Sequence, residues 1–313
     1  MDTGYTDRFQ SDHAEKTNTV ARQCHEVICW RELAAPQSGA DTLPWTPQCR
    51  TRTSGAWEDI SPPLDEVSCV WEPAVLVDDD GTVWLASIDH PTEIDTVPAT
   101  GVWLQSWTPD DGWSAQQNSP GDLNYPTHIV AVPGGSGDWL VAFAAADTAA
   151  GSRNSRNVRV YRVSLGQPWT ELARTRTPSG SIGGLSTGYD RHERPAVRTD
   201  GDRISVALTG YTEQPEGVFL GLLESRDGGQ SWSHTELNKT GQIFPHVRPV
   251  WGGDGSLYWA RQVGGEATVC RRAPSDTVTC TETGAPYVEG LTPAAVSAHS
   301  GDQQWVQQPL RWD

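Results

Sequence analysis

The chain has 313 residues, of which 36% are hydrophobic and 20% charged, with 31 Gly, 22 Pro and 15 Trp; this composition suits a globular protein and excludes collagen, a coiled coil and wholesale disorder. No apolar run approaches the roughly 20 residues of a membrane helix, so we expect no membrane insertion. A formal net charge of −17, from 40 acidic and 23 basic residues, disfavours nucleic acids and anionic membranes as partners.

The N-terminal part of the chain is expected to begin with a flexible arm. Residues 1–19 are polar and show no periodic pattern, whereas residues 20–313 carry the pattern of a single domain. Two runs rich in strand-forming residues open that domain, Glu26–Leu33 and Cys49–Thr53.

A hairpin pattern then recurs five times along the chain. Each copy has a proline that opens a short apolar run, a turn rich in Gly and Asp, and a second apolar run, which predicts a β-hairpin with the proline in its first strand. The prolines of the five copies are Pro73, Pro126, Pro195, Pro245 and Pro293. A second pair of strand-like runs follows four of the hairpins, and four strands repeated about every 50 residues are the pattern of a β-propeller blade.

The fifth hairpin lacks a second pair of strands, because the sequence stops at Asp313. The runs Glu26–Leu33 and Cys49–Thr53 can supply the missing third and fourth strands. We therefore predict an all-β fold, a β-propeller of five four-stranded blades whose ring is closed by N- and C-terminal strands that share the last blade. A sixth blade is the alternative, if residues 174–193 contain one.

The six cysteines favour disulfides and an oxidising compartment, so we expect a secreted or periplasmic protein; reduced, buried thiols in the cytosol are the alternative. No Cys-x-x-Cys pair and no zinc-site spacing occurs. Six cysteines allow fifteen connectivities. The blade alignment selects one of them: Cys29–Cys49 and Cys270–Cys280 bridge equivalent hairpins, which leaves Cys24–Cys69.

One turn carries a family motif. The segment Ser225–Trp232 resembles the Asp-box of sialidase-like (BNR-repeat) propellers, with Ser225, Asp227, Gly229 and Trp232 at the motif positions. Such a turn needs a carboxylate to accept backbone N–H groups, glycines in conformations that other residues avoid, and an aromatic ring that packs the turn onto its blade. In that family the motif lies away from the active site, so the resemblance implies the fold.

The resemblance also implies where a site would lie. In sialidase-like propellers, residues just before each anchoring proline and just after each second strand build one face of the ring. A sialidase uses a Tyr activated by a Glu, an acid on a loop, and arginines that clamp the substrate carboxylate bidentately. The residues that could fill these roles are Tyr211 with Glu72 or Glu193, Asp89 as the acid, and Arg194, Arg261 and Arg311 as the clamp. Trp71-Glu72-Pro73 stands where the family has Arg-Ile-Pro.

Other chemistries fit the same face. Five-bladed glycosidases of the arabinanase and invertase type use three axial carboxylates, for which Glu72, Asp89 and Glu193 are the candidates. His128 and His246 fall at near-equivalent positions of two repeats and could hold a transition metal, as in a metal-dependent polysaccharide lyase. Four tryptophans fall outside the repeated positions and could stack on a sugar: Trp45, Trp71, Trp251 and Trp312.

The sequence thus favours a carbohydrate-active protein that hydrolyses a glycosidic bond with axial carboxylates and needs no cofactor. We expect a glycan or another small polar ligand on the axial face, and a monomer. The alternatives are a lectin or protein-binding propeller without catalysis and, third, a metal-dependent polysaccharide lyase.

Overall fold

The computed structural model describes residues 14–22, 25–33, 45–62, 69–78, 80–90, 101–120, 123–134, 138–146, 156–177, 184–213, 216–237, 242–244, 247–291, 295–299 and 305–309. For some strand residues, identified below where they matter, it describes the backbone alone. These ranges contain strands, turns and irregular segments and no helix, and hence none long and apolar enough to cross a membrane.

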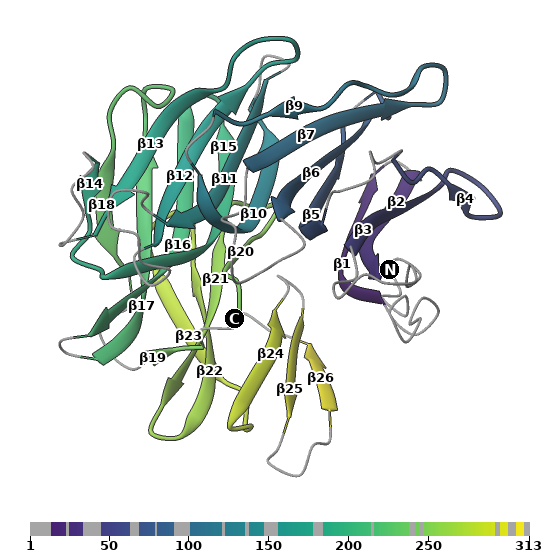
Figure 1. Cartoon of the computed structure of the whole chain (residues 1–313). Coiled ribbons are helices and arrows are strands. Elements are labelled where there is room, and N and C mark those ends of the chain that lie inside the picture. Colours follow the sequence, from purple (N-terminus) through teal and green to yellow (C-terminus); the bar gives the residue numbers. More distant parts are fainter. Residues whose placement is uncertain are drawn as a thin grey trace, which may run out of the picture.

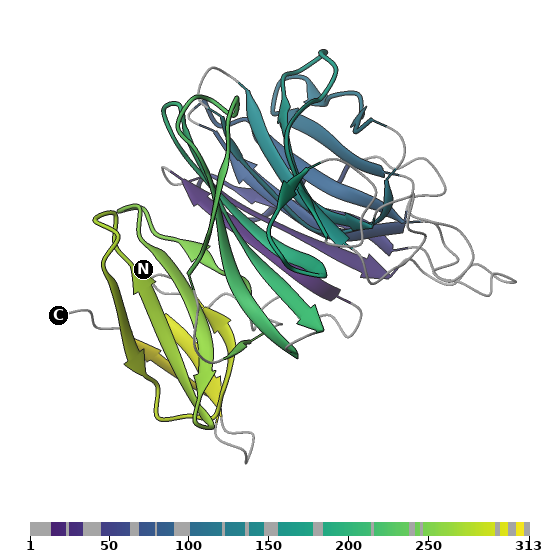
Figure 2. The ribbon, with the colours of Figure 1, turned by 90° about the vertical axis from the view of Figure 1, so that its left-hand side faces the viewer.

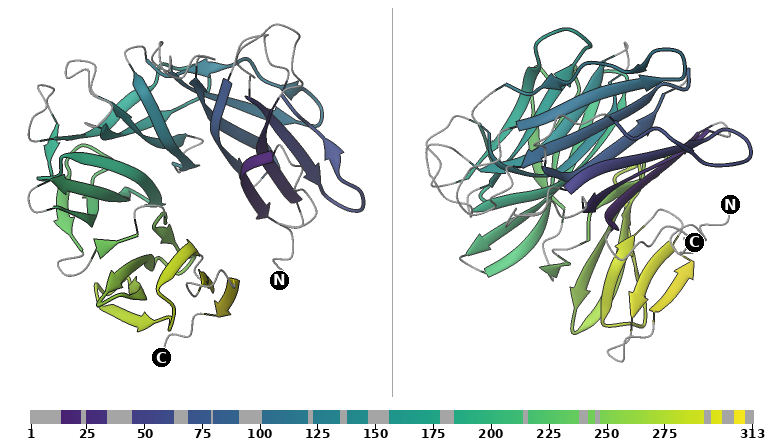
Figure 3. Two further views of the ribbon diagram at one scale, coloured as in Figure 1. Left: turned by 60° about the horizontal axis from the view of Figure 1, so that its bottom comes forward. Right: turned by 45° about the vertical axis from the view of Figure 1, so that its right-hand side comes forward.

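The described strands form six sheets, numbered here in chain order (Figure 1). The sheets follow one another around a common centre, with sheet 1 and sheet 6 at the two ends of the arc (Figure 3). A side view shows the green strands of sheet 4 beside the yellow-green strands of sheet 5, with the yellow strands of sheet 6 next to sheet 5 (Figure 2). Sequential antiparallel sheets around one centre are the architecture that the repeat predicts.

Sheets 1 and 2 are built from the first nine strands. Sheet 1 contains β1 (Ala14–Arg22), β2 (His25–Leu33), β3 (Trp45–Arg52) and β4 (Glu58–Asp59). Sheet 2 contains β5 (Cys69–Val77), β6 (Val83–His90), β7 (Gly101–Thr108), β8 (Gly112–Trp113) and β9 (Gln117–Asn118), with both β8 and β9 paired to β7.

Sheets 3 and 4 lie in the middle of the chain. Sheet 3 contains β10 (Asn124–Pro133), β11 (Trp139–Ala146), β12 (Arg156–Val163), β13 (Thr170–Arg176) and β14 (Leu185–Ser186), the last of them parallel to β13. Sheet 4 contains β15 (Arg191–Asp200), β16 (Arg203–Glu213), β17 (Glu216–Ser225) and β18 (Ser233–Glu236).

Sheets 5 and 6 complete the described part of the fold. Sheet 5 contains β19 (Gln242–Ile243), β20 (Val250–Trp251), β21 (Leu257–Val263), β22 (Glu266–Arg272) and β23 (Val278–Glu282), and both β19 and β20 pair with β21. Sheet 6 contains β24 (Tyr287–Leu291), β25 (Ala295–His299) and β26 (Trp305–Pro309).

The anchoring prolines occupy one structural position in three sheets. The register of the first hairpin shifts between Trp71 and Ala74 in sheet 2, between Asn124 and Thr127 in sheet 3, and between Glu193 and Ala196 in sheet 4. Pro73, Pro126 and Pro195 each lie inside that irregularity. Proline has no N–H to give to a ladder, so a bulge is where a strand tolerates it. The alignment of the repeat is correct in these sheets; Pro245 and Pro293 lie outside the described residues.

The two ends of the chain form separate sheets, which corrects the prediction of a shared last blade. β1 pairs with β2 at the edge where a C-terminal strand was expected, and β24–β26 pair only with one another among the described strands. β1 begins at Ala14, inside the stretch expected to be an arm. Six sheets therefore replace five blades, and the described part of residues 174–193 supplies β14 and the edges of β13 and β15, with no sheet of its own.

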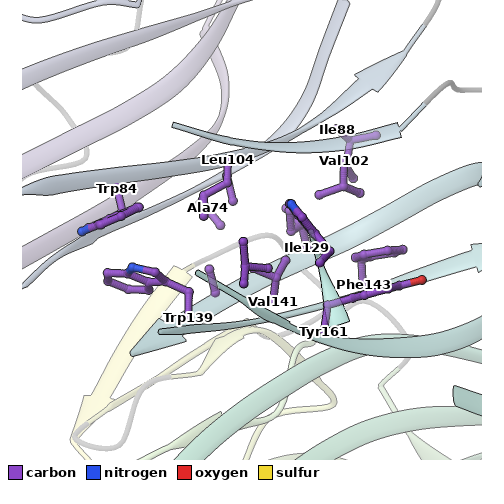
Figure 4. Close-up of a cluster of buried hydrophobic side chains, with 14 of the residues drawn as sticks. Ala74, Trp84, Ile88, Val102, Leu104, Ile129, Trp139, Val141, Phe143 and Tyr161 are labelled. Atoms are coloured by element: carbon purple, nitrogen blue, oxygen red, sulfur yellow. The ribbon is translucent and has the colours of Figure 1, made fainter. Parts of the chain in front are cut away.

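Side chains between neighbouring sheets form the core. Between sheets 2 and 3, the rings of Trp84 and Trp139 lie 4.7 Å apart, and Phe143 stacks on Tyr161 at 5.5 Å (Figure 4). Fully burying a side chain such as Phe143 contributes about 1.5–3 kcal/mol. Similar clusters join sheets 1 and 2, 3 and 4, and 4 and 5. Tryptophans at repeated positions thus hold sheet to sheet.

Two disulfides bridge cross-strand pairs, as predicted. Cys29 faces Cys49 across β2 and β3, and Cys270 faces Cys280 across β22 and β23. Cys24 lies outside the described residues and only the backbone of Cys69 is described, so the third pairing remains a prediction.

The turn after β17 has the hydrogen bonds that its sequence predicts. The Asp227 carboxylate accepts the backbone N–H groups of Gln230 (3.0 Å) and Ser231 (2.9 Å), and hydrogen bonds from the Ser231 hydroxyl and amide lower the pKa of Asp227 to about 2. The buried Ser225 hydroxyl accepts the Gly229 N–H at 2.8 Å. Gly229 has a φ of 95°, a conformation that suits glycine.

Candidate axial site

The candidate site lies at the end of sheet 4 where β15 begins and β16 ends, which we call the axial face. Arg191 pairs with Tyr211 and Glu193 pairs with Thr209 across these strands. Residues two apart on a strand point to the same side, so these four side chains share one face of the sheet. They line a shallow surface depression together with Gly210 and Val218.

Glu193 is the centre of the polar contacts in this site. The Arg156 Nη1 atom, at the start of β12 in the preceding sheet, donates to Glu193 Oε1 at 2.8 Å. The Arg191 Nε atom lies 3.3 Å from the same oxygen, and His128 Nε2, from β10, lies 3.9 Å from Oε2. Basic groups from two sheets thus converge on one carboxylate whose side chain is 16% exposed.

His192, the residue before Glu193 on β15, contacts the backbone of Arg156. His192 is fully buried, and its Nδ1 lies 3.0 Å from the Arg156 carbonyl oxygen. A carbonyl only accepts, so Nδ1 carries the proton and Nε2 accepts from the Thr187 hydroxyl. Burial lowers the pKa of His192 to about 4, and this imidazole is neutral at neutral pH. Adjacent residues of β15 therefore fix both the backbone and the guanidinium of Arg156.

The backbone is strained beside the anchoring prolines of sheets 3 and 4. His128 has a φ of 59° and Arg194 a φ of 49°, values that residues other than glycine rarely adopt. Such residues cost of order 1–3 kcal/mol each and concentrate at functional sites. Both lie within two residues of an anchoring proline, and both flank Glu193, His128 in space and Arg194 in sequence.

Two residues set the position of Tyr211: Arg191, which contacts its ring, and Gly210, the residue before it on β16. The Arg191 guanidinium lies 5.1 Å from the centre of the Tyr211 ring, a cation–π geometry. A Cβ at Gly210 would lie 2.1 Å from the ring of Tyr189, which packs on the other side of the sheet. Tyr189 in turn stacks parallel to Phe219 at 6.2 Å. Only glycine at 210 lets this aromatic packing support the strand that carries Tyr211.

The structure brings together three of the predicted site residues: Glu193, Tyr211 and His128. Arg194 follows Glu193 on β15, and Arg261 lies near the end of β21, the corresponding end of sheet 5. For the candidates of sheet 2 the backbone alone is described, and it places them near the start of β5 or the end of β6: Trp71, Glu72 and Asp89. His246 and Arg311 lie outside the described residues.

Sequence reasoning missed Arg156 and Arg191. Arg191 could have been found, because it lies two residues before Glu193 and must share its face if β15 is a strand. Arg156 gave no signal, since its contact with Glu193 spans two sheets and 37 residues of sequence. Within the described ranges, no group of three or more His, Cys, Asp or Glu side chains could hold a metal ion.

The arrangement suits a ligand that carries negative charge or many hydroxyl groups. Arg156 and Arg191 contact a single carboxylate in a chain whose net charge is −17, and Arg194 follows that carboxylate on β15. A cleft can focus a potential opposite to that of the whole molecule. Guanidinium groups pair bidentately with carboxylates and sulfates, and an ionised carboxylate accepts hydroxyl protons.

Comparison with known proteins shows the fold. No family model matches the sequence, and no curated protein matches it. Among solved structures, Penicillium chrysogenum α-L-arabinanase, complexed with arabinobiose, superposes with a TM-score of 0.56 at 15% identity, over 96% of this chain and 93% of that one. A Hadza microbial sialidase superposes with a TM-score of 0.59 at 13% identity, over 92% of this chain and 63% of that one.

A third similar structure is an ulvan lyase, a polysaccharide lyase bound to -[GlcA(1-4)Rha3S]-, with a TM-score of 0.54 at 11% identity, over 86% of this chain and 64% of that one. The chain therefore spans less than two thirds of the sialidase and of the lyase. At these identities the similarity shows a shared β-propeller fold, and function has to be argued from the site.

Proposed function

We propose that the protein is a carbohydrate-active β-propeller that takes a glycan at the axial pocket and hydrolyses a glycosidic bond there. One observation carries the proposal: Glu193 is held by Arg156 and Arg191, within 3.9 Å of His128, in the pocket that Tyr211 lines. The similar propellers include a sialidase and an arabinanase, which supports a sugar as the ligand class.

In this proposal Glu193 acts as a base. Its carboxylate lines the same pocket as Tyr211, where a nucleophilic hydroxyl needs a proton acceptor beside it. Glu193 would take the proton of the Tyr211 hydroxyl while the phenolic oxygen attacks the anomeric carbon and the glycosidic C–O bond breaks. An acid from sheet 2, Asp89 or Glu72, would protonate the leaving oxygen, and water would then release the sugar from Tyr211.

Arginines beside this centre would select the substrate. Arg194, Arg261 and Arg311 are proposed to bind an acidic group of the glycan, since a planar fork matches a carboxylate or a sulfate. The three belong to different segments of the sequence, so they would bind the group from several sides. A glycan with a carboxylate or a sulfate near the scissile bond is the expected substrate class.

Binding without catalysis is the second candidate, and one observation favours it. Glu193 is already engaged by two arginines and held across two sheets, which is also how a purely structural ion pair looks. A lectin would use the same arginines and Tyr211 for recognition and release no product.

The setting of the protein follows from the same features. The two disulfides support a secreted or periplasmic location, because such bonds persist in oxidising compartments. A monomer with a glycan as its only partner is proposed.

The experiment is incubation with a panel of sialylated, uronic-acid-containing and neutral glycans, with mass spectrometry of released products and retained glycans. Glu193→Gln and Tyr211→Phe are compared with the wild type; Phe keeps the ring beneath Arg191 and removes only the hydroxyl. Release that both variants abolish supports hydrolysis. Retention without release makes the protein a lectin, and neither release nor retention across the panel contradicts the proposal.

A further inference from the structure

The larger of the two pockets described here lies at the opposite end of β15 from the axial site. It has a volume of about 110 Å³ and opens between the turns of sheets 4 and 5. Its lining residues are Arg198, Asp200, Arg203, Ser205, Trp251, Asp254, Gly255, Arg272 and Pro274. We call it the distal pocket. The turn Ser225–Trp232 lies at this same end of sheet 4, since Ser225 pairs with Ile204.

The aromatic wall of the distal pocket is fixed in place. Trp251 is half-buried, and its indole Nε1 donates to the Ala196 carbonyl at 3.0 Å, which holds the ring between sheets 4 and 5. The side chain packs against the core between these sheets and also lines the pocket. A rigid, half-buried indole offers an apolar face at little entropic cost.

A polar wall faces the same space. The Arg198 Nη1 atom donates to the Gly252 carbonyl at 2.9 Å, and its guanidinium lies against Gly255, where a Cβ would be 3.1 Å from Cζ. Gly255 has a φ of 85°, so both the backbone and the arginine require glycine there. Arg198 is thereby oriented by the backbone, with guanidinium N–H groups left over for a ligand.

The charges of the distal pocket are balanced from outside it. Glu224 pairs with Arg203 at 2.5 Å and with Arg272 at 3.7 Å, and Arg272 also pairs with Asp276 at 2.5 Å. Arg271 pairs with Asp254 at 2.9 Å. Carboxylates of Asp200 and Asp254 stand in the wall itself. An anionic ligand would face these carboxylates, whereas a neutral polyol can donate to them and accept from Arg198.

We infer that the distal pocket is a second glycan-binding site, which seats one neutral sugar residue on Trp251 with hydrogen bonds from Arg198 and to Asp200. A sugar combines an apolar ring face with hydroxyl groups that donate and accept, and this pocket pairs an indole with a guanidinium and a carboxylate. The inference does not depend on catalysis at the axial face, because none of the residues is shared.

A distal site would change how the protein engages a long glycan. Two sites on one rigid body raise the effective concentration of a polymer at the weaker of them. Since the sites occupy the two ends of β15, they would serve different segments or branches of the glycan.

Isothermal titration calorimetry with neutral arabino-, xylo- and gluco-oligosaccharides tests the inference on the full chain. We expect binding that Asp200→Ala and Trp251→Phe each weaken about tenfold, because a hydrogen bond to a charged group and part of the stacking surface are lost. Arg226→Gln, an exposed change in the neighbouring turn, and Glu193→Gln at the axial face leave this binding unchanged. Melting curves confirm that the variants are folded.

The inference is overturned by any of three results: no neutral oligosaccharide binds at millimolar concentration; binding is unaffected by both distal variants; or sulfated and carboxylated oligosaccharides bind more tightly through Asp200 and Trp251 than neutral ones do. Binding that falls only with Glu193→Gln would place the sugar at the axial face and would also overturn the distal site. Failure of the axial proposal leaves the distal readouts unaffected.

Discussion

Two glutamates of sheet 4 make nearly the same contacts at opposite ends of the sheet. Glu193 lies 2.8 Å from Arg156 and 3.3 Å from Arg191, and Glu224 lies 2.5 Å from Arg203 and 3.7 Å from Arg272. Their side chains are 16% and 12% exposed. In each case one arginine comes from sheet 4 and the other from a neighbouring sheet, so both pairs join sheets.

What differs is the surroundings of the two carboxylates. Glu193 lies beside Tyr211 and His128, next to backbone with positive φ at Arg194, whereas Glu224 lies on a regular stretch of β17. A partly buried ion pair between sheets therefore occurs at both ends of sheet 4, and such a pair alone does not mark a functional site. The Glu193 site differs from the Glu224 ion pair in two ways: side chains from several strands converge on it, and the backbone beside it is strained.

The largest effect on stability is expected at Gly210, where the ring of Tyr189 packs against the strand that carries Tyr211. Gly210→Ala should cost about 3 kcal/mol, because the new Cβ would overlap the buried ring of Tyr189, 2.1 Å away. Chemical unfolding measures the loss. Gly253→Ala is the matched control, since a Cβ there meets nothing within 4 Å, and its unfolding free energy should stay within about 0.5 kcal/mol of the wild type. Equal losses in both variants would show that Tyr189 is not packed as described.

A pH-dependent effect is expected from His192, which fixes Arg156. Its pKa is about 4 in the folded chain against 6.5 for a free side chain, because burial disfavours the cation. The unfolded chain therefore binds a proton first as the pH falls from 6.5 towards 4, and the folded state loses about 2 kcal/mol by about pH 5. Above pH 6.5 the residue contributes no pH dependence.

The variant His192→Gln isolates this contribution. It should unfold more easily at neutral pH, because the fit to Arg156 and Thr187 is imperfect, and should lack the extra slope between pH 6.5 and 4. The half-buried His234 also has a lowered pKa because of burial, and it is present in both proteins. Identical slopes for the two proteins would contradict the buried, neutral imidazole.

A smaller effect is expected at the end that carries Glu224. Ser225→Ala removes the acceptor of the buried Gly229 N–H and should cost about 1–2 kcal/mol in unfolding free energy. Ser275→Ala, in an exposed turn, should change it by less than about 0.5 kcal/mol. Glycan release by Ser225→Ala should equal that of the wild type, and a loss of release would link this turn to the axial site.

The fold was predictable as far as its signals are local. Proline bulges, Asp/Gly turns and cysteines in facing strands placed the hairpins of sheets 2, 3 and 4 and both described disulfides. The separation of the two terminal sheets was not predictable, because Ala14–Arg22 is polar and its pairing with β2 has no periodic signature. The site followed the same rule: Glu193 and Tyr211 flank recognisable hairpin positions, whereas Arg156 reaches them only through the packing of one sheet on another.

The most direct test of the account compares Glu193→Gln with Glu224→Gln for release and retention of the best glycan of the panel, with melting curves of both variants. Each change removes one charge from a carboxylate held by two arginines, so we expect similar losses of stability, about 2 kcal/mol. The account predicts that only Glu193→Gln abolishes release or binding, while Glu224→Gln behaves as the wild type at the axial face. Equal activity in the two variants, whether both retained or both lost, would contradict the assignment of Glu193 to the functional site.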